Sequence, residues 1–290
     1  MTGRRIKIWT GIGTYVVAGT AFAAPALADM PRTAEPPASA LARPLQLAET
    51  ARPAEKPHEH QGGEQGGEGG ERGVAATAPP DEAFLLRLLL MKGHLRVGRE
   101  LVQQNRWNDA MPHFLHPTEE IYKELAPALA ERKIAPFDKN LEALAALVKA
   151  KQRPQEVAKA YDALLAKLDA AAASIAAETR QKPAFTLAVV ESLLEVAASE
   201  YKGALEKGRI ANPVEYQDSR GFVWTADDLV RGLAPTLKAK DAAAYAAVES
   251  GFAALKRAWP AAVPGKGPAV PEAQVSADIS RIVLAMSRLR

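Results

Sequence analysis

The feature that most constrains the fold is an internal duplication, in which residues 222–237 repeat residues 114–129 in diverged form. The first segment reads FLHPTEEIYKELAPAL and the second reads FVWTADDLVRGLAPTL. A leading Phe, an acidic pair, a basic residue and a Leu-Ala-Pro-x-Leu run fall in one register, with Phe114 and Phe222 lying 108 residues apart. A chain built from two related copies is predicted to fold as two related units.

The copies differ in their ionisable side chains. The acidic pair is retained but both histidines are lost: Glu119 and Glu120 match Asp227 and Asp228, His113 matches Gly221, and His116 matches Trp224. The repeat therefore predicts a common scaffold that carries different chemistry in each half.

Residues 1–28 have the pattern of a secretory signal peptide. Arg4, Arg5 and Lys7 precede an apolar run, which ends in the small-x-small sequence Ala26-Leu27-Ala28. This predicts cleavage after Ala28 and a periplasmic mature protein. An uncleaved membrane anchor is the competing interpretation.

Residues 29–80 are rich in Pro, Ala, Glu and Gly, which predicts a disordered, flexible linker. His58 and His60 lie within it and could collect a divalent metal loosely, although a solvated linker is the simpler interpretation.

The composition excludes several kinds of chemistry. The chain has no cysteine, so it has no disulfides, thiolate ligands, c-type haem attachment or thiol catalysis. Any metal must be held by nitrogen or oxygen ligands, or by methionine sulfur. The net charge of +3 partly reflects the basic signal peptide, and no Lys/Arg stripe alternates with aromatics, so we expect no nucleic-acid partner.

From residue 81 onward the chain is Ala- and Leu-rich, with apolar residues at helical spacing. The predicted helices of the first repeat (81–182) are 82–105, 109–132 with a break near Pro117, 138–151 and 154–180. Those of the second repeat (183–290) are 184–207, 213–238 with a break near Gly221, 241–259 and 271–289. The fold class is all-α, with duplicated four-helix units that either pack face to face or, as the Ala-rich helices favour, merge into one bundle. The two copies are 103 residues apart at the turn, where Arg106 matches Arg209, but 108 residues apart where Phe114 matches Phe222. The five-residue difference predicts a longer second-copy loop between Arg209 and Phe222.

The predicted folded region has three histidines, all in the first helix pair: His94, His113 and His116. If helices 82–105 and 109–132 pack antiparallel, a rise of about 1.5 Å per residue places Glu119 and Glu120 level with His94 along the helix axis. His116 lies one turn lower and His113 about two turns lower. This predicts a metal site made of His94, His116 and Glu119 or Glu120, with His113 next in line. Hydrogen-bonded histidines in a helix interface are the alternative.

Imidazole with carboxylate suits iron, zinc, copper or nickel, and two carboxylates favour iron. Met91 and Met111 lie near His94 and His113 in sequence and would favour copper, although such methionines are typical of a core.

The second copy offers a separate set of carboxylates around a Gly/Asn-Pro turn, namely Glu200, Glu215 and Asp218. These predict an all-oxygen site for a hard cation, with tyrosine hydroxyls beside it. A capped hairpin with solvated carboxylates is the plain alternative.

The same run, EYKGALEKGRIANPVEYQD at residues 200–218, resembles the periplasmic N-terminal segment of bacterial high-affinity iron permeases. The resemblance implies a periplasmic role in handling iron or a related divalent metal. The chain departs from such permeases in lacking their membrane helices. His116 and Glu119 also fit the His-x-x-Glu spacing of imelysin-like periplasmic metal proteins.

Together these features predict an exported metal-binding protein that captures or relays a transition metal, with iron favoured over copper or zinc. Its expected partner is a membrane permease or another periplasmic protein. A helical interaction protein with structural histidines, or a copper-binding protein, remains the alternative. An enzyme ranks third, because the sequence has no phosphate loop, His-Glu-x-x-His or Gly-x-Ser-x-Gly motif.

Overall fold

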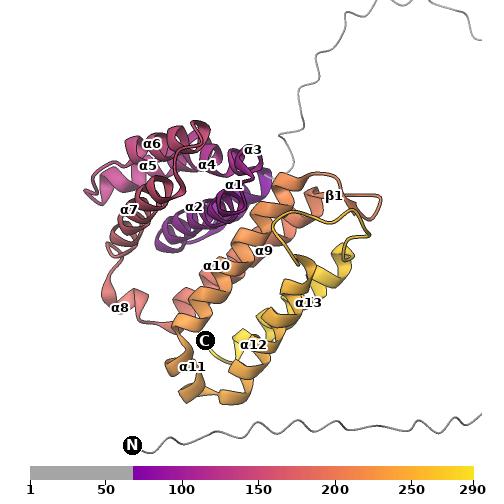
Figure 1. Ribbon diagram of the computed structural model, residues 1–290. Helices are drawn as coiled ribbons and strands as arrows, with labels where there is room; N and C mark the ends of the chain where they lie inside the picture. Colours follow the sequence, from indigo (N-terminus) through magenta and orange to yellow (C-terminus); the bar gives the residue numbers. More distant parts are fainter. Residues whose placement is uncertain (1–67) are drawn as a thin grey trace, which may run out of the picture. The chain divides into compact units, whose positions relative to one another are not determined.

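The computed structural model describes residues 68–290, and all of these belong to one compact unit (Figure 1). The elements are helices apart from one two-stranded hairpin within this part of the chain, which confirms the all-α prediction. The predicted signal peptide and the linker up to residue 67 lie outside the described residues. Among the described helices, none is long and apolar enough to cross a membrane.

The first copy begins with a long helix, continues with a broken one and ends with two more. Its elements are α2 (Pro80–Gln103), α3 (Trp107–Ala110), α4 (Pro112–His116), the π-helical turn η1 (Pro117–Ile121), α5 (Tyr122–Glu131), α6 (Asp138–Lys149) and α7 (Pro154–Ala172), followed by the short connecting helix α8 (Ala177–Arg180).

The second copy repeats this order. Its elements are α9 (Pro183–Gly203), the strands β1 (Leu205–Glu206) and β2 (Arg209–Ile210), α10 (Pro213–Gly232), α11 (Ala234–Lys240), α12 (Ala242–Leu255), the 3-10 turn η2 (Lys256–Ala258) and α13 (Glu272–Ser287). Pro127 lies in α5 and Pro235 in α11, so the two prolines fall in corresponding parts of the copies. The order of elements supports the duplicated four-helix arrangement.

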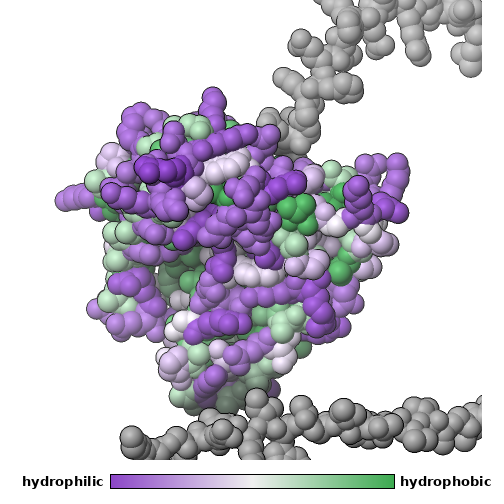
Figure 2. Space-filling view, viewed as in Figure 1, coloured by the Kyte–Doolittle hydropathy of each residue, from purple (hydrophilic) through white to green (hydrophobic). Residues whose placement is uncertain are grey.

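The two copies are joined through α2, α9 and α10. Helix α10 packs along both α9 and α2, while α7 lies against α2, and α13 lies against both α9 and α12 (Figure 1). Apolar side chains of both copies form one continuous core, and the visible outer face is mainly hydrophilic (Figure 2). The polar groups described below are therefore buried where the copies meet.

The break predicted near Gly221 is wrong, because α10 runs without interruption to Gly232. Gly221 instead permits a close helix crossing. A Cβ atom at Gly221 would lie 2.2 Å from the carbonyl oxygen of Gly93, and one at Gly93 would lie 2.4 Å from the Phe222 ring. Glycine at both positions lets α10 touch α2 backbone to backbone.

The break near Pro117 is confirmed as a π-helical turn. Proline has no N–H to donate, and the Tyr122 N–H reaches back five residues to the Pro117 carbonyl. The turn changes the helical register beyond His116, so residues 119 and 120 do not follow an ideal helix.

The predicted extra length of the second copy is present but lies earlier than expected. The connection before α10 spans residues 204–212, whereas α2 and α3 are joined by residues 104–106. The added residues form the β1–β2 hairpin, in which Lys207 and Gly208 both have positive φ. The strands occupy the turn and replace no helix.

The linker prediction is wrong for its last part, because residues Glu68–Thr77 form helix α1. Glycine-rich composition disfavours an isolated helix, yet this one packs against α2 and α9 and buries Ala75. Tertiary packing outweighs weak helix propensity here.

Helix α12 begins with a charged cap that gives a pH-dependent prediction. The Asp241 carboxylate accepts from the Ala244 N–H at 2.9 Å and pairs with Arg288 at 2.6 Å. The backbone hydrogen bond, aided by Arg288, lowers the pKa of Asp241. Because the pKa of Asp241 is lower in the folded than in the unfolded chain, the ionised carboxylate stabilises the fold above the unfolded pKa of about 3.9. This stabilisation is lost as the pH falls through the folded pKa of Asp241.

We therefore expect Asp241→Ala to lower the melting temperature at pH 7, with a difference from wild type that shrinks below about pH 4. Asp241→Asn is the control, because the asparagine side chain can still cap the helix but carries no charge. Melting curves across pH test this. An effect of Asp241→Ala that is constant with pH would contradict it.

Candidate metal centre

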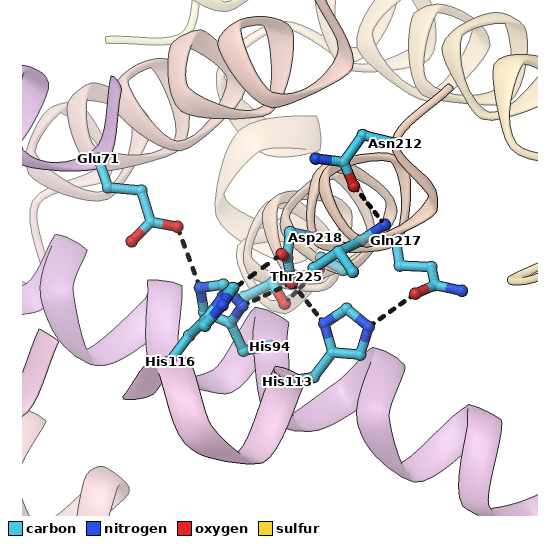
Figure 3. Close-up of polar contacts among 10 residues, drawn as sticks. Glu71, His94, His113, His116, Asn212, Gln217, Asp218 and Thr225 are labelled. Carbon is cyan, nitrogen blue, oxygen red and sulfur yellow. Dashed lines mark hydrogen bonds and ion pairs between the residues drawn. The ribbon is translucent and has the colours of Figure 1, made fainter. Parts of the chain in front are cut away.

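Two histidine-bearing helices of the first copy meet α10 of the second copy at a buried carboxylate. His94 lies on α2, His113 and His116 lie on α4, and Asp218 lies on α10. Figure 3 shows the three imidazoles directed toward Asp218. The centre is thus composite, with its imidazoles from one copy and its carboxylate from the other.

One oxygen of Asp218 is shared by two imidazoles. Asp218 Oδ1 lies 2.6 Å from His94 Nδ1 and 2.7 Å from His113 Nδ1. The other oxygen, Oδ2, lies 3.9 Å from His116 Nδ1. The relative exposures of His94, His113 and Asp218 are only 1%, 0% and 2%. These three residues offer ligand atoms that lie within 4.8 Å of one another.

Two further side chains fix the orientation of the imidazoles. Glu71 Oε1 of α1 lies 3.0 Å from His94 Nε2, and Gln217 Oε1 of α10 lies 2.8 Å from His113 Nε2 (Figure 3). With the outer nitrogens held in this way, both Nδ1 atoms face Asp218. Acceptors behind a ligating imidazole set its tautomer and direction. Sequence reasoning missed both residues.

The packing that creates the centre depends on small residues of α2. Gly98 admits α4, since a Cβ atom there would lie 2.7 Å from the Phe114 ring. The Gly93–Gly221 crossing admits α10 in the same way. Phe114 and Phe222, which match in the repeat, thus both pack against glycines of one helix.

In the described protein the centre is a buried charge network. Burial opposes a charge on His94, but Asp218 and Glu71 outweigh it and raise the pKa of the imidazole well above its usual value. Burial alone would raise the pKa of Asp218, whereas the two neighbouring imidazoles lower it well below its usual range. Burial and the charge of His94 lower the pKa of His116. The site therefore already favours a positive charge held against Asp218.

The predicted carboxylate set lies beside the same centre. Glu200 on α9 and Glu215 in the first turn of α10 are both buried, as is Asp218. The Asn212 side chain caps α10 by accepting from the Val214 N–H at 3.0 Å, and this fixes the helix start that carries Glu215. Burial, together with repulsion from Glu71 and Asp218, raises the pKa of Glu200 to about 9.

The predicted histidine site and the predicted carboxylate site form one centre in the structure, and Glu119 and Glu120 lie outside its ligand group. Asp218, assigned to a separate carboxylate site, contacts the histidines, and the solvated-hairpin alternative is wrong because Glu200 and Asp218 are each only 2% exposed. Glu119 is exposed, and Glu120 is partly buried. Neither belongs to the ligand group formed by His94, His113 and Asp218, because the π-helical turn intervenes.

Trp224, which occupies the place of His116 in the second copy, serves packing. The Arg220 guanidinium lies 4.0 Å from its ring centroid and Lys256 Nζ lies 4.8 Å from it. Arg220 also forms a two-pronged ion pair with Glu100 of α2, at 2.9 and 3.0 Å. These contacts stabilise the junction between the copies.

The donor set fits a divalent transition metal. Neutral imidazoles and a carboxylate suit ferrous iron and zinc. The nitrogen and oxygen ligands of zinc lie about 2.0–2.2 Å from the ion. Met91 is wholly buried in the apolar core and Met111 packs against that core, as expected for filler.

Comparison with known proteins relates the second copy to iron uptake. Residues 176–289 match the model of the iron permease-associated 4-helix bundle domain. The match spans α8 to α13 and includes residues 200–218, so it supports the resemblance to iron permeases seen in that run. The imelysin-like spacing of His116 and Glu119 receives no such support. No curated protein and no solved structure matched the chain.

Proposed function

We propose that this protein is an exported, periplasmic metal-binding protein that captures or relays iron for an uptake partner. The observation that carries the proposal is the convergence of His94, His113 and Asp218, from both copies, in a buried junction. The family match of residues 176–289 favours iron as the cargo and a permease as the partner.

The geometry is better suited to binding than to maintaining an inert core. A core histidine needs one or two hydrogen bonds, which single neutral partners can supply. Here two imidazoles direct the same nitrogen toward one carboxylate oxygen, and acceptors hold both rings from behind. A divalent ion would displace the Nδ1 protons that both imidazoles direct at Asp218.

The test is ferrous-ion binding by the metal-free protein under anaerobic conditions. We expect His94→Ala/His113→Ala to weaken binding by more than about a hundredfold, because it removes two of the three ligands, whereas loss of a supporting residue costs about 10- to 100-fold. Helical content, measured by circular dichroism, should remain close to wild type.

His58→Ala/His60→Ala is the matched control, since it removes as many imidazoles from the preceding segment, and we expect it to retain the tight site. Unchanged iron binding in the His94/His113 variant would contradict the proposal. Parallel titrations with cuprous and zinc ions test the cargo. Tight cuprous binding without ferrous binding would replace iron with copper.

A further inference from the structure

The three imidazoles of the candidate metal centre differ in their access to solvent. The side chains of His94 and His113 are only 1% and 0% exposed, whereas the His116 side chain is 31% exposed. A metal site needs an entry path as well as a set of ligands. Of the three imidazoles, His116 is therefore the one that an ion arriving from solution can contact first.

His116 lies beside the buried ligand group and not within it. The ligand atoms of His94, His113 and Asp218 lie within 4.8 Å of one another, and His116 does not complete this group among the described residues. Its ring stands edge-on to that of His94, with the two centroids 5.7 Å apart. As placed, His116 does not share an ion that both buried imidazoles hold.

His116 and Asp218 are nevertheless close enough to hold an ion between them. His116 Nδ1 lies 3.9 Å from Asp218 Oδ2. Nitrogen and oxygen ligands that each lie about 2.0–2.2 Å from a zinc ion can be at most about 4.3 Å apart. The other oxygen of the carboxylate, Oδ1, faces the Nδ1 atoms of His94 and His113 at 2.6 and 2.7 Å (Figure 3). Asp218 thus presents one oxygen to the exposed imidazole and the other to the buried pair.

We propose that His116 is the exchange ligand of the centre. It binds an incoming hydrated ion together with Asp218 Oδ2, the ion then passes to Asp218 Oδ1, His94 and His113, and release follows the same route in reverse. The inference rests on the proposed function, because the buried ligands are the destination of the ion.

The proposal separates the rates of exchange from the affinity. By this route the ion loses its water in steps, gaining a protein ligand before it leaves solvent. A group that contacts the ion only during passage lowers the barrier in both directions, so it speeds uptake and release equally and leaves Kd unchanged. A ligand of the bound ion has the opposite signature, because its removal makes release faster.

The experiment measures ferrous-ion exchange by the full-length chain under anaerobic conditions. Uptake by the metal-free protein is timed by adding a chromogenic ferrous chelator at increasing delays after mixing with iron. Release is followed by mixing the loaded protein with an excess of the same chelator, and Kd is obtained by competition with it. We expect His116→Ala to slow both uptake and release by at least about tenfold, with Kd close to that of wild type.

Two further variants separate loss of the ligand from a change in the shape of the entrance. His116→Phe keeps an aromatic ring, as Trp224 does at the matching place of the second copy, and should be as slow as His116→Ala. His116→Asp restores a ligand and should recover fast exchange. Glu119→Gln is the matched control, because Glu119 is an exposed carboxylate three residues after His116, and we expect it to retain wild-type rates.

Faster release from His116→Ala would overturn the proposal, since it would mean that His116 holds the bound ion or that its ring only closes the entrance. Unchanged rates in His116→Ala would also overturn it. Equal slowing in Glu119→Gln would overturn the pairing of His116 with Asp218. These three results leave the proposed function standing, whereas a wild-type chain that binds no ferrous ion would overturn the proposed function and this inference together.

Discussion

Gly221→Ala is expected to destabilise the protein by roughly 3 kcal/mol, at or above the upper end of the usual cost of overpacking a core. The new methyl group would lie 2.2 Å from the Gly93 carbonyl oxygen and 2.8 Å from its carbon, and neither atom can rotate away. Helix α10 must therefore move away from α2. Because Asp218 lies on α10 and His94 on α2, the same change should weaken metal binding.

Gly232→Ala on the same helix is the matched control, since a Cβ atom there meets nothing within 4 Å. Alanine is favoured over glycine within a helix, so this variant should be unchanged or more stable by up to about 1 kcal/mol. Urea denaturation of both variants gives the comparison. Equal stability of Gly221→Ala and wild type would show that the two helices can separate without cost.

The helices were predictable from the sequence because their signals are local. Apolar residues at helical spacing marked the buried faces of α7, α9 and α10, and each of these helices has a proline in its first turn. Glu68–Thr77 was missed because its helix depends on packing against α2 and α9. Composition alone describes that segment as linker.

The sequence predicted the histidines and Asp218 of the candidate site, but it missed Glu71 and Gln217 and predicted the arrangement only in part. His94 and Asp218 are 124 residues apart and belong to different copies. Their contact depends on the crossing of α2 and α10 at Gly93 and Gly221. The expected partner, Glu119, was placed by applying the rise of a straight helix across the predicted break near Pro117, and the π-helical turn there changes the register.

The duplication explains why a composite centre could arise. The first copy supplies imidazoles at 113 and 116, where the second has Gly221 and Trp224. The second copy supplies Asp218, which matches Ala110 in the repeat register of 108 residues. The missing side chain at Gly221 is itself what brings α10 against α2. Glycine at 221, where the first copy has a histidine, thus lets the carboxylate of the second copy reach the histidines of the first.

Glu200→Gln is expected to stabilise the metal-free protein, and the gain should increase with pH. The pKa of Glu200 is raised from 4.5 to about 9 in the folded chain, chiefly by burial and then by Glu71 and Asp218. Above pH 4.5 the unfolded chain releases a proton that the folded chain must keep. Folding therefore loses stability from about pH 4.5 upward until the folded group also ionises near pH 9.

At pH 7 this protonation cost is roughly 3 kcal/mol, taking about 1.4 kcal/mol for each pH unit above the unfolded pKa. Glutamine has nearly the same shape and no charge to lose, so the variant should gain about that much at pH 7 and almost nothing at pH 4. Chemical denaturation in the presence of a chelator measures the difference, with Glu206→Gln as the exposed control. A pH-independent effect, or a variant less stable than wild type at pH 7, would mean that Glu200 is ionised in the metal-free fold.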